Sequence, residues 1–170
     1  MIQVLLVVLF CAAAFGQTGN SLSEAKAPAV NPDLSLAEQL YQSGNFGGAL
    51  EKYQSVLKST PNLVEAQVGV VQCLLREQKI DEASASATSY LASQPNSASL
   101  NAVMGDVEFR NARMTESEIS YHKALAIDSR QVDAYLGLFR LYRAYSLYGH
   151  AYDALQRAHE IAPDNPRVQM

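Results

Sequence analysis

The stretch ALEKYQSVLKSTP, residues 49–61, opens with alanine and closes with proline, and the same frame returns 34 residues later in ASASATSYLASQP, residues 83–95. It returns again in AYDALQRAHEIAP, residues 151–163, while residues 117–129 fill the intervening period with serine at both ends. A fixed period of this length is typical of a repeat array, in which each unit packs on the next. The chain therefore divides into units that span residues 30–63, 64–97, 98–131 and 132–165.

Each unit has the apolar pattern of two amphipathic helices. In the fourth unit, apolar residues recur at the i, i+3, i+4 and i+7 spacing of one helical face: Tyr135, Leu138, Phe139 and Tyr142. In the first unit, Asn31–Pro32 is a preferred helix start and Gly44 is a preferred helix end. The residues that we expect to face the core of this unit are Leu36, Ala37, Leu40, Ala49, Tyr53 and Val56. The pattern predicts an all-α fold of about eight helices.

With these positions the chain resembles the tetratricopeptide repeat (TPR) family over residues 30–165. The family's small residue at position eight of the repeat is Ala37 in the first unit and Gly105 in the third, and its aromatic residue at position 24 is Tyr53 and Tyr121. The fourth unit departs from the pattern, because Phe139 occupies its position eight. The resemblance implies a right-handed α-solenoid of four helix-turn-helix repeats that binds a partner peptide or protein along a concave groove.

The N-terminus has the features of an export signal. Residues 2–15, IQVLLVVLFCAAAF, carry no charged side chain but are shorter than the ~20 apolar residues of a membrane-spanning helix. We expect residues 1–16 to be a signal peptide that is cleaved after Gly16, and residues 17–29 to be a flexible leader. The mature protein would then be secreted or periplasmic and would not span a membrane. Cleavage removes Cys11 and leaves Cys73, so no intramolecular disulfide is expected.

The last residues repeat a helix-start signal. Asn165–Pro166 matches Asn31–Pro32, so residues 166–170 are the start of a further helix or a truncated end. Two hypotheses follow. A partner or a second copy covers the end of the array, or the chain is the front portion of a longer protein.

Composition and the motifs that are missing exclude several classes of protein. Thirteen Lys+Arg against 17 Asp+Glu give a formal charge of −4, which excludes a broadly basic nucleic-acid binder, and 48% hydrophobic residues exclude a disordered chain. The sequence contains no His-Glu-x-x-His, no phosphate-binding lysine loop and no serine nucleophile elbow. We therefore expect no enzyme activity, cofactor or metal.

The resemblance places the groove at positions 2, 5, 9, 12 and 13 of each first helix. The candidate partner-binding residues taken from these positions are Glu38, Tyr41, Gln42, Gln72, Leu75, Arg76, Asp106, Phe109, Arg110, Arg140 and Arg143. Arg76, Arg110 and Arg143 lie 34 and 33 residues apart, so successive helices are expected to present them near one another.

Two interpretations of these arginines remain open. They can grip a carboxylate of an acidic partner, since a guanidinium binds a carboxylate with two hydrogen bonds. They can instead complement the negative ends of their own helices, and Arg110 is also spaced to pair with Asp106.

The sequence thus predicts an exported protein–protein interaction scaffold whose partner is a peptide or protein with acidic groups. The alternative is a non-catalytic targeting or regulatory module at the front of a larger exported enzyme. Self-association through the C-terminal repeat is a further hypothesis.

Overall fold

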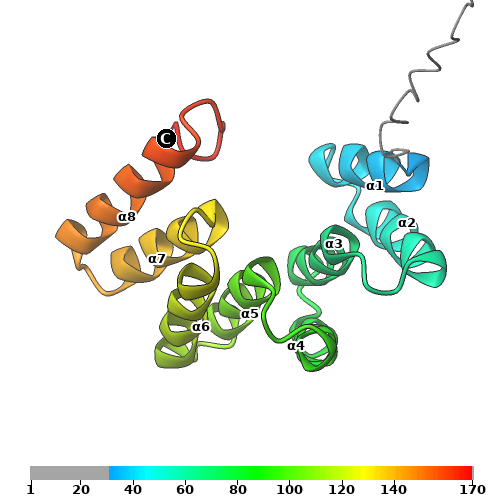
Figure 1. Ribbon diagram of the computed structural model, residues 1–170, viewed down its shortest axis with the longest axis horizontal. Helices are drawn as coiled ribbons and strands as arrows, with labels where there is room; N and C mark the ends of the chain where they lie inside the picture. The colour runs from blue at the N-terminus through cyan, green and yellow to red at the C-terminus, as the bar shows by residue number, and fades with distance from the viewer. Residues whose placement is uncertain (1–30, 170) are drawn as a thin grey trace, which may run out of the picture.

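The computed structural model describes residues 31–169, which form an array of paired helices (Figure 1). The predicted signal peptide and leader, residues 1–29, lie outside the described residues. The helices are α1 (Pro32–Gln42), α2 (Phe46–Ser59), α3 (Val64–Arg76), α4 (Ile80–Ser93), α5 (Ala98–Arg110), α6 (Met114–Ile127), α7 (Val132–Ala144) and α8 (Tyr148–Ile161). The all-α prediction is confirmed, and each predicted unit holds one pair of helices.

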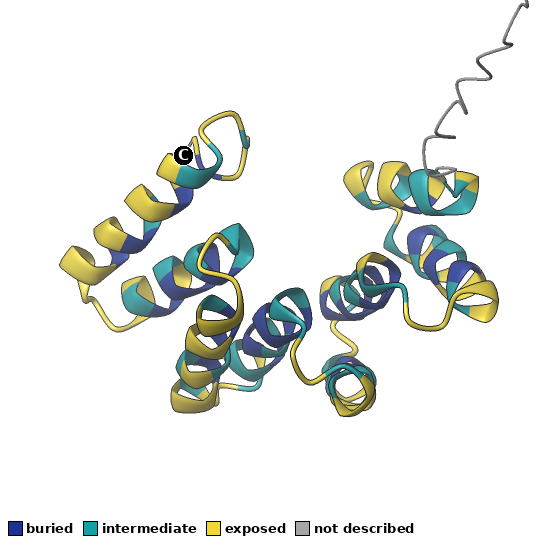
Figure 2. Ribbon diagram, in the orientation of Figure 1, coloured by how far each residue is buried: buried dark blue, intermediate teal, exposed yellow. Residues whose placement is uncertain are grey.

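The array is curved, and its two sides are built from different helices. The first helices of the units, α1, α3, α5 and α7, follow the inner side of the curve, whereas α2, α4, α6 and α8 follow the outer side (Figure 1). Buried residues gather where these helices face one another (Figure 2). None of the described helices is long and apolar enough to cross a membrane.

The local signals at the first helix act as predicted. The Asn31 side chain accepts a hydrogen bond from the backbone N–H of Asp33 at 3.0 Å, which caps the start of α1. Gly44 has a φ of +83°, in the left-handed region that glycine enters without steric cost. Both ends of α1 are therefore encoded by residue type.

Two tyrosines hold successive repeats together. The Tyr53 ring lies against Gly69 of the next unit, and an added Cβ on that glycine would lie 2.5 Å from the ring. The fully buried Tyr121 ring lies between Gly105 of its own unit and Gly137 of the next. An added Cβ on Gly105 would lie 2.5 Å from the Tyr121 ring, and an added Cβ on Gly137 would lie closer still. These glycines are required because any side chain there would occupy the space of the ring.

One core prediction is wrong. Leu36 was expected to face the core, but its side chain is 39% exposed, whereas Ala37 is fully buried. Of the equivalent residues in later units, Val70 and Leu138 are buried and Met104 is partly buried, because a preceding unit packs on their helices. No preceding unit packs on α1 within the described residues, so Leu36 stays at the surface.

The C-terminal residues do not continue as a helix within the described part of the chain. Residues 163–164 and 166–168 form turns, although the Asn165–Pro166 signal predicted a helix start. Val168 is buried against Leu136 of α7 and Ala158 of α8. The segment is therefore packed on the last repeat.

Candidate functional site

The inner side of the array contains a cavity of about 260 Å³, which we call the arginine pocket. Its lining residues are Tyr41, Gln72, Leu75, Arg76, Asp106, Phe109, Arg110, Arg140 and Arg167. Except for Arg167, all of them were predicted from the repeat positions. They come from α1, α3, α5 and α7, because the curve brings the same face of each first helix to one side (Figure 1).

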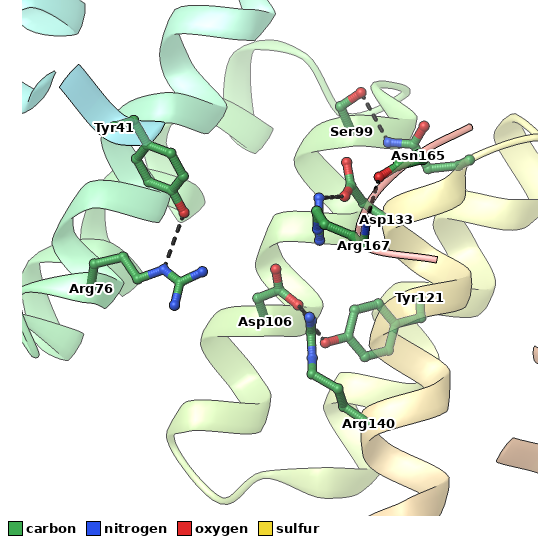
Figure 3. Close-up of polar contacts among 10 residues, drawn as sticks. Tyr41, Arg76, Ser99, Asp106, Tyr121, Asp133, Arg140, Asn165 and Arg167 are labelled. Atoms are coloured by element: carbon green, nitrogen blue, oxygen red, sulfur yellow. Dashed lines mark hydrogen bonds and ion pairs between the residues drawn. The ribbon is translucent and has the colours of Figure 1, made fainter. Parts of the chain in front are cut away.

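Arg76 is held by aromatic residues of the first repeat. Its Nε donates a hydrogen bond to the Tyr41 hydroxyl at 3.2 Å (Figure 3). Its guanidinium carbon lies 6.0 Å from the centre of the Tyr41 ring and 5.9 Å from that of Phe46, within the range of a cation–π contact. These partners orient the guanidinium and leave its positive charge uncompensated.

Arg110 also binds neutral groups. One of its terminal nitrogens donates to the Leu75 carbonyl oxygen at 3.3 Å and to the Gln78 side-chain oxygen at 3.0 Å. Neither Arg76 nor Arg110 forms an ion pair with a carboxylate of the described residues. Because a guanidinium has five N–H donors, both keep donors for a ligand.

Asp106 belongs to a different network from the one that its spacing to Arg110 suggested. The Tyr121 hydroxyl donates to Asp106 Oδ1 at 2.7 Å, and Arg140 forms an ion pair with the same oxygen (Figure 3). Burial raises the pKa of the Asp106 carboxyl, and Arg140 and Tyr121 oppose that rise. Burial is also the largest cause that raises the pKa of Tyr121, followed by the Asp106 charge. Arg140 therefore offsets a carboxylate in the wall of the pocket.

The expected set of adjacent arginines is incomplete. Arg143 lines neither this cavity nor its neighbour and lies over the Phe139 ring of its own helix, 5.4 Å from the ring centre. It stands one residue earlier in the repeat than Arg76 and Arg110, and one residue turns a side chain by about 100° around a helix. Arg167 lines the pocket instead, and no repeat pattern in the sequence indicated it.

A second cavity of about 350 Å³ adjoins the arginine pocket. It shares Tyr41, Gln72 and Arg167 with the arginine pocket, and it also holds the predicted residues Glu38 and Gln42. The remaining lining residues are Tyr53, Val64, Glu65, Val68, Gly69, Ser99 and Asp133. We refer to the two cavities together as the concave groove.

The described residues include one cysteine and several possible metal ligands, whose surroundings decide whether they can react or bind a metal. Cys73 is a buried free thiol, and burial raises its pKa to about 12, so it is protonated and unreactive at neutral pH. Within residues 31–169, no group of three His, Cys, Asp or Glu side chains is placed to hold a metal ion.

An exposed aromatic patch lies on the last repeat. We define this patch as Tyr145, Leu147, Tyr148 and Tyr152. Tyr148 is 68% exposed, whereas Phe46, Ile80 and Met114, at the same repeat position, are partly buried.

Comparisons with known proteins agree with the architecture. A family model described as tetratricopeptide repeat matches residues 40–107. No curated protein sequence matches the chain significantly. The array is an all-α helical-repeat solenoid. Its fold is that of tetratricopeptide repeat solenoids, as the sequence predicted.

Solved structures show the same fold at low identity. TTC0263, a thermophilic TPR protein of Thermus thermophilus, is 19% identical with a TM-score of 0.72, and the match covers 81% of this chain and 76% of that one. MamA is 22% identical with a TM-score of 0.55 and 78% coverage of both chains. A tetratricopeptide repeat protein from Parabacteroides merdae ATCC 43184 is 15% identical with a TM-score of 0.53, covering 81% of this chain and 55% of that one.

Proposed function

We propose that this chain is a non-catalytic protein–protein interaction scaffold. Its concave groove binds the acidic groups of a partner peptide or protein. The tetratricopeptide repeat fold itself implies protein partners. The observation that carries the acidic preference is the arginine pocket, where Arg76 and Arg110 have only neutral partners among the described residues.

The pocket offers both charge and apolar contact. A carboxylate that enters it can accept charge-assisted hydrogen bonds from two guanidinium groups, which are about twice as strong as neutral ones. Leu75 and Phe109 lie in the same wall and supply apolar surface for the rest of the ligand. A segment with glutamate or aspartate beside an apolar side chain fits this combination.

The test is the affinity for an extended peptide with three glutamates, compared with the same peptide carrying glutamines. Fluorescence anisotropy measures both affinities. We expect Arg76→Ala with Arg110→Ala to weaken binding of the glutamate peptide at least ~100-fold, because the change removes two charged hydrogen bonds that contribute about 1.5–3 kcal/mol each. Binding of the wild-type protein should also weaken with salt.

The matched control removes the same charge outside the groove. Arg130 and Arg157 are exposed and line neither cavity. Arg130→Ala with Arg157→Ala should leave the affinity within about twofold of wild type, as expected for exposed sites. Equal binding of the glutamate and glutamine peptides by the wild-type protein would refute the acidic preference.

Export is part of the proposal. The apolar run at residues 2–15 and the small residues that follow it support a cleaved signal and a secreted or periplasmic protein. The mature chain would begin at Gln17. A targeting or regulatory module of a larger exported enzyme would use the same groove and is the alternative role.

Self-association is a second candidate, favoured by the exposed patch on the last repeat. If the patch joins two copies, sedimentation velocity of the wild-type protein should show association that grows with concentration. Tyr148→Ser with Tyr152→Ser should then sediment as a monomer, because the change removes two exposed rings from the contact. A wild-type protein that stays monomeric at high concentration contradicts this role.

A further inference from the structure

The C-terminal segment, residues 165–169, repeats a hydrogen bond that joins the earlier units. In the second, third and fourth units, the side chain at position four donates to the backbone carbonyl at position 32 of the preceding unit, and the C-terminal segment makes the same bond to the fourth unit. The four bonds are Gln67 to Pro61 at 2.7 Å, Asn101 to Pro95 at 3.2 Å, Tyr135 to Ser129 at 3.3 Å and Gln169 to Pro163 at 3.0 Å. Gln169 therefore occupies position four of a fifth unit.

Burial follows the same register. Val168 holds position three of that unit and is 3% exposed. Ala66, Leu100 and Ala134 hold position three of the earlier units and are fully buried. The C-terminal segment is thus packed as the opening of a fifth unit, although its backbone forms turns.

This docking brings Arg167 to the junction of the two cavities. A terminal nitrogen of Arg167 donates to Asp133 Oδ1 at 2.6 Å (Figure 3). Arg167 lines both cavities, and Asp133 lines the second one. The ion pair is partly exposed to solvent and faces the groove.

The Arg167–Asp133 ion pair reduces the negative charge of the groove wall. Two carboxylates of the groove wall are paired with arginines, Asp106 with Arg140 and Asp133 with Arg167. Without Arg167, Asp133 would have no cationic partner among the described residues. A free carboxylate beside the arginine pocket would repel an acidic ligand.

We propose that Arg167 is a positioning residue for the acidic partner, which acts by offsetting the Asp133 carboxylate, and that the docked C-terminal segment holds it there. This inference rests on the proposed function, since it concerns the same groove and the same ligand. Under this proposal the C-terminal segment forms part of the groove wall and affects the binding of the acidic partner.

The test uses the glutamate and glutamine peptides with the full mature chain. Arg167→Ala should weaken binding of the glutamate peptide about fivefold and leave the glutamine peptide unchanged, because the loss is electrostatic and partly screened. Arg167→Ala with Asp133→Asn should restore the affinity to within about twofold of wild type, since the repelling charge is then absent. A merely structural role for Arg167 would not be rescued by Asp133→Asn.

Docking has its own readout, which needs no peptide. Val168→Asp should lower the Tm by about 5 °C, because the change buries a carboxylate between α7 and α8. Gln169→Ala, a milder change, should lower it by about 1 to 2 °C, on the order expected for one hydrogen bond.

The outcomes separate the two claims. Equal affinity of the wild-type protein for both peptides defeats the proposed function and leaves the docking measurement intact. If the wild type prefers glutamate but Arg167→Ala binds equally well, the role of Arg167 is wrong. A weakened Arg167→Ala that Asp133→Asn does not rescue also overturns it. An unchanged Tm in Val168→Asp overturns the docking.

Discussion

We expect Gly137→Ala to lower the free energy of unfolding by about 3 kcal/mol, although alanine is the better helix former. The added methyl group would meet the Tyr121 ring, which is fully buried. The ring cannot move away, because Gly105 lies against its other side and its hydroxyl is bonded to Asp106. Urea denaturation followed by circular dichroism measures the change.

The matched control is Gly149→Ala in α8. An added Cβ at Gly149 meets nothing within 4 Å, so only helix propensity acts there. We expect this variant to be unchanged or up to ~1 kcal/mol more stable. If the two glycine variants unfold at the same urea concentration, the close packing of Tyr121 against Gly137 is not a determinant of stability.

Tyr121→Ala should have the larger effect and lower the free energy of unfolding by about 4 kcal/mol. The change leaves a cavity between two repeats, and it removes one of the two groups that hold the Asp106 carboxylate. Tyr121→Phe separates the two contributions, because it keeps the ring and removes the hydroxyl. That variant should lose about 1.5–3 kcal/mol, as expected for a hydrogen bond to a charged acceptor.

The control for the aromatic ring is Tyr152→Ala. Tyr152 is 67% exposed on α8, so its removal should change stability by less than about 0.5 kcal/mol. A loss in Tyr152→Ala as large as that in Tyr121→Ala would mean that burial between repeats is not what makes Tyr121 important. Urea denaturation again gives both values.

The sequence was sufficient for the repeat architecture because the period of 34 residues is carried by small and aromatic residues at fixed positions. Alanine stands at position 20 of three units and serine in the third, so the period can be read directly from residue types at fixed positions. The position of Tyr121 in the core could also be predicted. Its contact with Gly137 could not, since Gly137 stands at position six rather than eight and meets a ring from another repeat.

The candidate groove was predicted less completely for a geometric reason. Positions from the family pattern identified the helix face, and Tyr41, Arg76 and Arg110 meet there. A shift of one residue turned Arg143 away from the groove. Arg167 follows the last predicted unit, so only the packing of the C-terminal segment revealed it.

The hydrogen bond from position four has a consequence for how such a protein changes over time. Its donor is glutamine, asparagine or tyrosine, and its acceptor is a backbone carbonyl, which every residue type provides. The residue at position four can therefore change among polar types without loss of the hydrogen bond, and the alignment of one unit on the next is kept. Duplication of one unit would keep this hydrogen bond, because the new unit carries both a donor at position four and an acceptor carbonyl at position 32.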